Sequence, residues 1–493
     1  MGRSNYPVWL CQNTFLIETN LCTHYHNPYL VSMKHTVTQL KSSRLDSFIA
    51  NPRKAIWTLG LPVMMGMAVQ TLYSIVDMLF VARISVNAIA ALAFNLPLFW
   101  LAMGISFGLG TGVTAVIARF IGAKDHEAAT NVAEHGLVLG LVFGGFFSIG
   151  GLIFGEEILL LLGTPENLIV DTLDYFHVIA GGFIFMITGI FLRSIFSGEG
   201  DTKTPVKIQI TSTIVNIILD PILIFGMDMG IRGAAWATVL SMLVAVAMYS
   251  RVILIKKATL LQLNFNAFNL DFSYFKDIFR IGLPASVSMI IMSMGGALFN
   301  WILVHYSADV VAGYQIAGRL DQIFFLPVMA IAGSLVTLVG MFYGAQRPDL
   351  IKQVIKDGLR YGIMIGVGSG IIFYLIAPYV FRIFTDDPVV NEVAISIIRT
   401  FAPFYWLIAI GMISGRSMQG LGTGIPSMVT TAIRVALVSG PLAYYFAVIL
   451  GKPCEWVWYS SIVAIIVAAS TSLVWLSIRI SKVKQSLQSS QRR

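Results

Sequence analysis

Asn216 and Asp220 lie in one of the most apolar stretches of the sequence, and Pro221 follows directly. A carboxylate in the middle of a bilayer costs roughly 2.5–3.5 kcal/mol on insertion scales, and such residues usually mark ion or proton pathways. Residues four positions apart share a helix face, and a proline cannot donate a hydrogen bond to the carbonyl of Ile217. The carboxylate, amide and free carbonyl together predict a site for a cation or a proton.

A second polar stripe occurs in the first apolar segment of the chain. Gln70, Tyr73 and Asp77 follow one another at steps of three and four residues, so they share one helix face. In the fifth apolar segment, Gln209 and Thr213 extend the stripe of Asn216 and Asp220 in the same way. The two stripes predict that two helices turn polar faces toward a common interior region.

Hydroxyl groups in the sixth apolar segment, at Thr238 and Ser241, could complete this interior site. Two carboxylates in an apolar setting can exchange protons near neutral pH, or they can share a bound sodium ion. Amides and hydroxyls inside membranes often only bridge helices. We therefore expect Asp77 and Asp220 to act in ion coupling, and helix bridging is the better interpretation for three others, namely Gln209, Thr213 and Ser241.

The elements that hold these residues must be membrane-spanning helices. Of 493 residues, 56% are hydrophobic and only 12% are charged, whereas soluble domains have about 25% charged residues. Apolar runs long enough to cross a bilayer recur roughly twelve times between residues 55 and 481. The composition predicts an all-α integral membrane protein with twelve transmembrane helices. The net charge of +8 does not indicate nucleic-acid binding, because the bases are spread over the connecting loops.

The connecting loops alternate between basic and acidic. Lys203 and Lys256 belong to the basic set, whereas Glu156 and Asp386 belong to the other set. Because cytoplasmic loops carry the excess of Lys and Arg, we expect both termini in the cytoplasm. A multi-pass protein of the plasma membrane follows, which in a bacterium is the inner membrane.

The chain is internally doubled. Gly60-Leu-Pro62 recurs as Gly282-Leu-Pro284, and Phe120-Ile-Gly-Ala123 recurs at the same spacing as Phe342-Tyr-Gly-Ala345. Each copy holds about six spans, so the copies have the same orientation and a pseudo-twofold axis along the membrane normal relates them. Two such six-helix bundles with a central cavity between them are typical of alternating access.

This repeat predicts the domain boundaries. We expect a cytoplasmic N-terminal tail over residues 1–50, an N-lobe over 51–257, a cytoplasmic linker over 258–280, a C-lobe over 281–481 and a tail over 482–493. The first 32 residues fit poorly with the rest and are interpreted as a tail or an upstream start codon, with Met33 as the true start. Their potential metal ligands, Cys11, Cys22, His24 and His26, match no standard zinc spacing.

The two copies differ in chemistry. Position 440 is Gly where the first copy has Asp220, and the seventh span, residues 281–304, contains no carboxylate. We therefore expect the coupling site in the first half only.

Polar residues of the eighth span allow two interpretations. Gln315, Arg319 and Gln322 follow at steps of four and three, and Asp321 lies beside them. They could line a cavity and contact substrate, or they could form a pair at the boundary of cytoplasm and bilayer, with Arg319 snorkelling. We leave both open, and for Arg434 in the eleventh span we favour snorkelling.

Three further features have structural interpretations. Gly104, Gly108 and Gly112 predict close helix packing. The segment from Gly198 to Pro205 predicts a cytoplasmic turn whose charges face solvent. Lone histidines near or within the spans have no metal-ligating partner at a suitable spacing: His135, His177 and His305.

The chain resembles the multidrug and toxic compound extrusion (MATE) family over residues 51–480. Four segments carry the resemblance: Leu72–Val81, Gly198–Pro205, Asn216–Gly226 and Gly230–Thr238. They are most similar to the DinF-like branch, which has its coupling carboxylates in the N-terminal lobe.

The resemblance implies antiport of cationic or amphipathic compounds against H+ or Na+, through the matched residues Asp77, Asn216, Asp220 and Thr238. Two departures limit it. The seventh-span glutamate of the NorM-like branch is absent, so its C-lobe sodium site is not expected. Ala82 and Arg83 stand where a glycine usually follows the first-span motif.

Our leading hypothesis is a monomeric secondary active exporter of small organic molecules, without a cofactor other than its coupling ion. A lipid-linked oligosaccharide flippase would need a strongly basic cavity, and deep Lys and Arg are scarce. A passive channel would show flux independent of a counter-gradient. No nucleophile–base arrangement or nucleotide motif indicates an enzyme.

Overall fold

The computed structural model describes residues 44–255, 259–261, 263 and 268–491. The chain divides into two units, residues 1–47 and 48–493, and the description below concerns the second. The expectations for Cys11, Cys22, His24, His26 and Met33 lie outside the described residues. Within these residues every regular element is helical, and twelve segments are long and apolar enough to cross a membrane, which confirms the predicted fold class.

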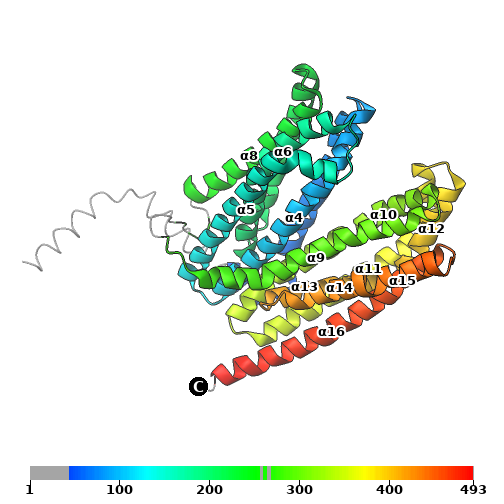
Figure 1. Cartoon of the computed structure of the whole chain (residues 1–493). Coiled ribbons are helices and arrows are strands. Elements are labelled where there is room, and N and C mark those ends of the chain that lie inside the picture. Colours follow the sequence, from blue (N-terminus) through cyan, green and yellow to red (C-terminus); the bar gives the residue numbers. More distant parts are fainter. Residues whose placement is uncertain (1–43, 256–258, 262, 264–267, 492–493) are drawn as a thin grey trace, which may run out of the picture. The chain divides into compact units, whose positions relative to one another are not determined.

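The first six spans form one helical bundle, the N-lobe (Figure 1). It consists of α3 (Pro52–Ala82), α4 (Val86–Gly122), α5 (His126–Leu161), α6 (Ile169–Gly198), α7 (Lys203–Pro221) with the π-helix η1 (Ile222–Gly226), and α8 (Gly230–Ser250) with the π-helix η2 (Arg251–Ile255). Helix α6 packs against α4, α5 and α8, and it is the most buried helix of this lobe.

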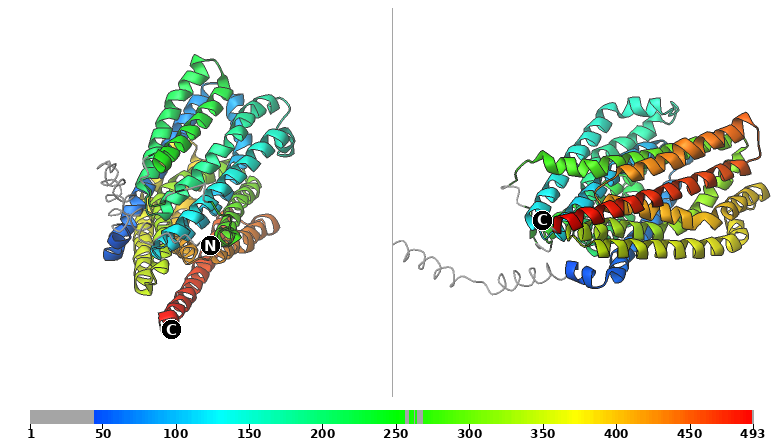
Figure 2. Two further views of the ribbon diagram at one scale, coloured as in Figure 1. Left: turned by 90° about the vertical axis from the view of Figure 1, so that its left-hand side faces the viewer. Right: turned by 90° about the horizontal axis from the view of Figure 1, so that it is seen from below.

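The last six spans form the C-lobe, which Figure 2 shows from two further sides. It consists of α9 (Phe272–Val304), α10 (Ala308–Gly344), α11 (Pro348–Phe384), α12 (Pro388–Phe401), η4 (Ala402–Phe404), α13 (Tyr405–Gly420), α14 (Ile425–Ala432), η5 (Ile433–Ser439), α15 (Gly440–Tyr444), η6 (Tyr445–Ile449) and α16 (Glu455–Gln491). Residues 272–280, which we assigned to the linker from the sequence, form the first turns of α9.

The internal repeat extends to individual backbone conformations. Ser85 caps α4 by accepting the N–H of Ala88, and Ser307 caps α10 by accepting the N–H of Val310. Lys124 and Gln346, at matching positions after α4 and α10, both have positive φ angles, of 61° and 55°. Gly200 and Gly422 form a second matched pair, with φ of 75° and 84°, a region that glycine enters without steric cost.

The lobes meet where α4 packs along α9 and α10. A β-carbon at Gly108 would lie 2.2 Å from the backbone nitrogen of Ser286, and one at Gly112 would lie 2.4 Å from the carbonyl oxygen of Ile278. Glycine permits this approach because it has no side chain. The predicted role of Gly104, Gly108 and Gly112 in close packing is confirmed.

Contacts between the lobes gather at one end of the spans, which we call the basic end: the end that holds the last residues of α4, α6, α10 and α13. Arg119 pairs there with Asp277 at 3.3 Å, and Arg53 of α3 pairs with Asp357 of α11 at 3.1 Å. Thr337 donates a hydrogen bond to the carbonyl oxygen of Ser197. The opposite end, with the last residues of α3, α5 and η1, is called the acidic end.

Candidate functional site

Asp220 lies at the point where α7 changes into the π-helix η1. The helix α7 ends at Pro221, and the next backbone closure runs five residues, from the Met227 N–H to the Ile222 carbonyl oxygen at 2.8 Å. Proline has no N–H to continue the α-helical ladder, and π-helical turns are frequent at functional sites. Asp220 and Asn216 are 0% and 1% exposed, so this break holds both side chains in the interior.

Helix α8 is brought to the same place by a glycine. A β-carbon at Gly233 would lie 2.7 Å from the carbonyl carbon of Leu223, so only glycine allows α8 to rest on the backbone of η1. Thr238 follows less than two turns later on α8. The close approach therefore sets the distance between Thr238 and Asn216.

The Asn216 amide joins the two helices. In the orientation that satisfies both neighbours, its nitrogen donates to Oδ2 of Asp220 at 3.1 Å and its oxygen accepts the backbone N–H of Thr238 at 3.2 Å. The other carboxylate oxygen of Asp220, Oδ1, is buried without a hydrogen-bond partner among the described residues. Buried polar atoms in folded proteins are nearly always paired, so Oδ1 is an exception within this interior group.

Asp77 approaches this group from α3. It is half-buried, and Val81, one turn further along α3, is buried in one cluster with Ile224, which follows Asp220 on η1. The hydroxyl oxygen of Tyr73 lies 3.4 Å from Oγ1 of Thr238. The structure thus brings together all four residues predicted for ion coupling, together with Tyr73.

Tyr175 of α6 also belongs to the site, and the sequence analysis missed it. Its side chain packs against the buried apolar residues Val81 and Ile224, which lie next to the carboxylates. Asp171 and Thr172 precede Tyr175 at helical spacing, and this short polar stripe is the signal that could have identified it.

An apolar cluster closes the site toward the acidic end. Val81 follows Asp77 by one turn, Ile224 follows Asp220, and Ala234 precedes Thr238 on the antiparallel helix α8. These three side chains are buried together in one cluster with Ala88, Ala91 and Ile231. Asp77, Asp220 and Thr238 therefore each have a buried apolar residue about one turn nearer the acidic end.

The secondary polar face of the N-lobe bridges helices. Nε2 of Gln209 donates to Oε1 of Gln70 at 2.7 Å, which joins α7 to α3. Ser241 donates to the Thr238 carbonyl oxygen and its own carbonyl accepts from Ser212. Thr213 is half-buried on the same helix as Gln209.

In the C-lobe the predicted polar group divides between two faces of α10. Arg319 precedes Thr337 by about five turns on the same face, and Thr337 contacts the N-lobe. Gln315 lies one turn before Arg319 and donates to Oδ1 of Asn300 at 3.0 Å. Arg319 is exposed and precedes Gly344, the last residue of α10 at the basic end, by 25 residues, so the interpretation as a pair at the cytoplasmic boundary is wrong.

The expectation that Asp321 lines the cavity is wrong. It lies on the opposite face of α10 from Thr337, and its Oδ1 accepts a hydrogen bond from the hydroxyl of Tyr405. The Tyr405 ring stacks on Phe324 in the C-lobe core. Gln322 is exposed, whereas Asp321 faces α13.

Arg434 is half-buried within η5, nine residues after the eleventh span begins at Ile425. That is about 14 Å along the helix from the basic end, and snorkelling of Arg434 stays a prediction. None of the ion pairs found among the described residues includes Arg319 or Arg434.

The turn from Gly198 to Pro205 also departs from expectation. Glu199 and Asp201 are buried instead of facing solvent. Oε2 of Glu199 accepts the N–H of Leu260 in the linker, and Asp201 accepts the N–H groups of Lys203 and Thr204 at the start of α7. These carboxylates order the turn and the linker.

The buried His135 likewise holds the linker. Its Nε2 accepts the N–H of Asp271, and its Nδ1 contacts the carbonyl oxygen of Asn131 at 2.7 Å. No cluster of three or more His, Cys, Asp or Glu side chains with metal-binding geometry occurs within the described part of the chain.

Arg416 is another residue that the sequence analysis missed. It donates to Oγ1 of Thr111 and to Oε1 of Gln419, both at 3.1 Å, and so joins α13 to α4 near the basic end.

The turn after α3 closes without the glycine that usually follows the first-span motif. Arg83 adopts an ordinary right-handed conformation there, with φ of −80°.

Twelve apolar helices in two repeat-related lobes, with a buried carboxylate group in one of them, define a membrane transporter and not an enzyme. Residues 62–222 and 284–445 match the MatE family model, and the chain belongs to this family.

Relatives and solved structures agree with this assignment. The chain is 28% identical over 398 residues to the probable multidrug resistance protein NorM of Thermotoga maritima, covering 80% of this chain and 85% of the relative. It is 28% identical over 404 residues to the multidrug export protein MepA of Staphylococcus aureus, covering 81% and 88%. A solved outward-facing multidrug resistance MATE family transporter superimposes with a TM-score of 0.83 at 30% identity, covering 88% of this chain and 97% of the other.

Proposed function

We propose that this transporter exports organic compounds by antiport with H+ or Na+, and that Asp77 and Asp220 of the N-lobe bind the coupling ion. The observation that carries the proposal is the buried Oδ1 of Asp220, which lacks a partner among the described residues. A proton on this oxygen, or a cation between the two carboxylates, would satisfy it. Coupling arises if the ion binds the inward-facing and outward-facing states with different affinities.

Asn216 and Thr238 hold the site in shape. The Asn216 amide fixes Oδ2 of Asp220 against the backbone of α8, so Oδ1 is the oxygen that remains for the ion. A sodium ion would find carboxylate and hydroxyl oxygens here, which suit hard cations. Movement of α3 relative to α7 and α8 would change the separation of Asp77 from Asp220 and thereby the affinity for the ion.

The contacts at the basic end support an outward-facing state, in which the lobes are joined on the cytoplasmic side. The excess of Lys and Arg in the loops at this end supports its cytoplasmic location and that of both termini. We place the transporter in the plasma membrane, which is the inner membrane of a bacterium, and propose that it acts as a monomer.

Cationic or amphipathic compounds are the proposed substrates. The names of the NorM and MepA relatives support export of several drugs. The N-lobe position of the carboxylates supports the DinF-like branch. Gln315, Arg319 and Gln322, which lie on the α10 face that contacts the N-lobe farther along, would contact the substrate.

Export from proteoliposomes tests the proposal. A fluorescent organic cation such as ethidium is the probe, and a pH gradient is imposed with and without Na+. Asp220→Asn and Asp77→Asn should each reduce gradient-driven export at least about 100-fold, because the carboxylate that binds the ion is lost. Asp321→Asn is the matched control, since Asp321 is a carboxylate of the C-lobe hydrogen-bonded to Tyr405. Full export by both N-lobe variants would exclude this coupling site.

A second candidate is a lipid-linked oligosaccharide flippase. Arg319 and Arg434, at mid-depth and outside the ion pairs of the described residues, favour it because pyrophosphate requires cations. Translocation of a fluorescent lipid-linked pyrophosphate sugar, lost in Arg319→Gln and retained in Asp220→Asn, would support this function over drug export.

A further inference from the structure

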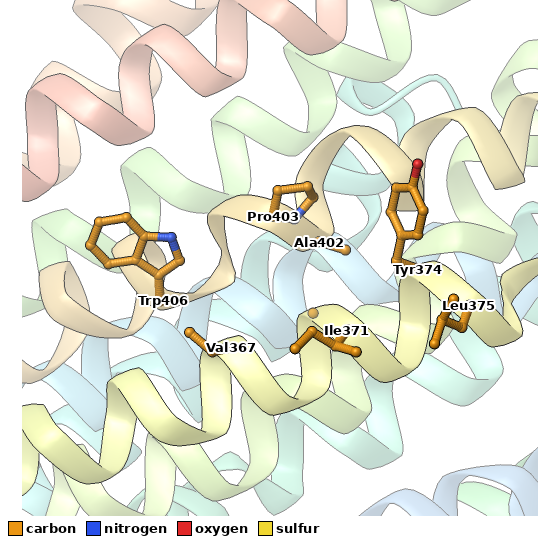
Figure 3. A pocket seen from close by; sticks show the side chains of 8 residues that line it. Val367, Ile371, Tyr374, Leu375, Ala402, Pro403 and Trp406 are labelled. Carbon is orange, nitrogen blue, oxygen red and sulfur yellow. The ribbon is translucent and has the colours of Figure 1, made fainter.

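A groove lies on the outer surface of the C-lobe, and none of its lining residues belongs to the carboxylate site of the N-lobe. It has a volume of about 330 Å³, the size of a small ligand pocket. Helix α11 contributes Val367, Ile371, Tyr374 and Leu375 along one wall. Ala402, Pro403 and Trp406 form the other wall, and Trp406 and Tyr374 stand at opposite ends (Figure 3).

The groove exists because the tenth span is interrupted. The helix α12 ends at Phe401, and the 3-10 turn η4 separates it from α13. Two glycines of α11 face this interruption: a β-carbon at Gly370 would lie 2.3 Å from the carbonyl oxygen of Ala402, and one at Gly366 would lie 2.6 Å from the backbone of Trp406. The backbones meet at the glycines, and the larger side chains on either side form the walls.

The groove opens toward the hydrocarbon of the bilayer. Ile371 and Leu375 are 58% and 63% exposed, and both belong to a span of high hydropathy. The lining is almost entirely apolar. An occupant must therefore be an apolar chain that is present in the membrane.

A cation lies beside the Tyr374 end of the groove. The guanidinium carbon of Arg399, on α12, lies 5.5 Å from the centre of the Tyr374 ring. Tyr374 precedes Arg382 by eight residues, which places it about 12 Å along the helix from that arginine at the acidic end. The Arg399 side chain is exposed, and no ion pair of the described residues includes it.

An exposed arginine at this depth is costly in a bilayer unless an anion or water reaches it. Its aromatic neighbour supplies a cation–π contact but no charge. The anion that a bilayer supplies is the phosphate of a phospholipid at the membrane interface, and a long arginine side chain can extend toward it from within a span. A phosphate beside Arg399 would place the acyl chain of the same lipid at the mouth of the groove.

We propose that this groove binds one acyl chain of a bilayer phospholipid whose phosphate pairs with Arg399. The site takes a lipid as a ligand, independently of the exported substrate and of the coupling ion. Free phosphate carries the same anionic group, and a second copy of the chain could cover the groove in place of a lipid, so the test has an arm for each.

Native mass spectrometry of the full chain in detergent tests the site. After delipidation, phosphatidylglycerol is added, and the fraction of protein that retains one lipid is measured. Arg399→Gln should reduce this fraction at least about fivefold. Arg382→Gln is the matched control, because Arg382 is an exposed arginine at the acidic end of α11 outside the groove. Its retention should equal that of the wild type.

Three further arms make the result decisive. Ile371→Trp should fill the groove and reduce retention even with Arg399 present; Ile371 is exposed, so the protein should fold. Diacylglycerol, which lacks the phosphate, should not distinguish wild type from Arg399→Gln, and glycerol phosphate should not compete. Equal retention of phosphatidylglycerol by the wild type and both groove variants would overturn the proposal. Displacement of the lipid by glycerol phosphate alone would also overturn it, because the phosphate would then be the ligand. A dimer that dissociates in Ile371→Trp would overturn it as well, because a second copy would then occupy the groove.

Discussion

Gly344 of α10 approaches the backbone of Arg119 of α4 so closely that a β-carbon would lie 1.8 Å from the Arg119 carbonyl oxygen. Their repeat counterparts make the reciprocal contact, since a β-carbon at Gly122 would lie 1.9 Å from the carbonyl oxygen of Met341. The internal symmetry of the sequence thus produces a symmetric closure of the two lobes at the basic end.

Gly344→Val should prevent this closure. The valine side chain would collide with the backbone of Arg119, which cannot move aside. The two lobes would therefore not close at the basic end. We expect export of ethidium from proteoliposomes to fall at least about tenfold, with normal insertion into the membrane. Gly333→Ala is the control on the same helix, because a β-carbon there has no neighbour within 4 Å. Equal activity of the two variants would show that transport does not need this contact.

Asn216→Ala should impair coupling without removing a carboxylate. The Asn216 amide donates to Oδ2 of Asp220, and a hydrogen bond to a charged group is worth about 1.5–3 kcal/mol. Ion-driven export should therefore fall about tenfold or more. Ser241→Ala removes a nearby hydroxyl that donates within α8 to the Thr238 carbonyl oxygen, and it should have a smaller effect. The measurement is the initial rate of export against the size of the imposed gradient, and a larger loss in Ser241→Ala would contradict the assigned roles.

Tyr405→Phe should lower stability and preserve transport. It removes the hydroxyl that donates to the Asp321 carboxylate, and an unsatisfied buried group costs about 1–3 kcal/mol. A lower unfolding temperature in detergent should accompany an unchanged export rate per folded molecule. Tyr379→Phe, a change at an exposed tyrosine of α11, should leave the unfolding temperature unaltered.

Asp271 gives a pH-dependent prediction at the start of α9. The N–H and hydroxyl of Ser273 hold the pKa of the Asp271 carboxyl below its ordinary value. A lowered pKa in the folded state stabilises the protein above the unfolded-state pKa of about 3.9, and this contribution is lost as the pH falls through the lower folded value. Asp271→Ala should therefore unfold at a lower temperature than the wild type at pH 7, and the difference should shrink toward pH 3.

Asp271→Asn is the control for that prediction, because asparagine also caps helices. It should retain most of the stability at pH 7 while losing the dependence on pH. A constant difference between Asp271→Ala and the wild type from pH 7 to pH 3 would assign the effect to packing instead of charge.

The sequence predicted most of the fold because membrane spans and repeats leave strong periodic signals. The pairing of Asp77 with Asp220 also followed from polar stripes in apolar segments. What the sequence left undetermined were contacts made by single residues. Tyr175 of α6 packs against the apolar cluster beside the carboxylates, and Tyr405 of α13 donates a hydrogen bond to Asp321.

Buried carboxylates in a loop were the other source of error. Glu199 and Asp201 stand among Gly, Thr, Lys and Pro, a composition that indicates an exposed turn. Asp201 is buried where it accepts the N–H groups of Lys203 and Thr204, and Glu199 is buried where it accepts the N–H of Leu260 in the linker. A contact between segments that distant in sequence has no local signature.

The apolar cluster of Val81, Ile224 and Ala234, one turn beyond the carboxylates, has a consequence for the energy supply of the cell. An ion that could pass straight through the N-lobe would dissipate the gradient without any export. In the proposed antiport, this apolar layer beside Asp220 would interrupt such a path and so protect the membrane against a leak.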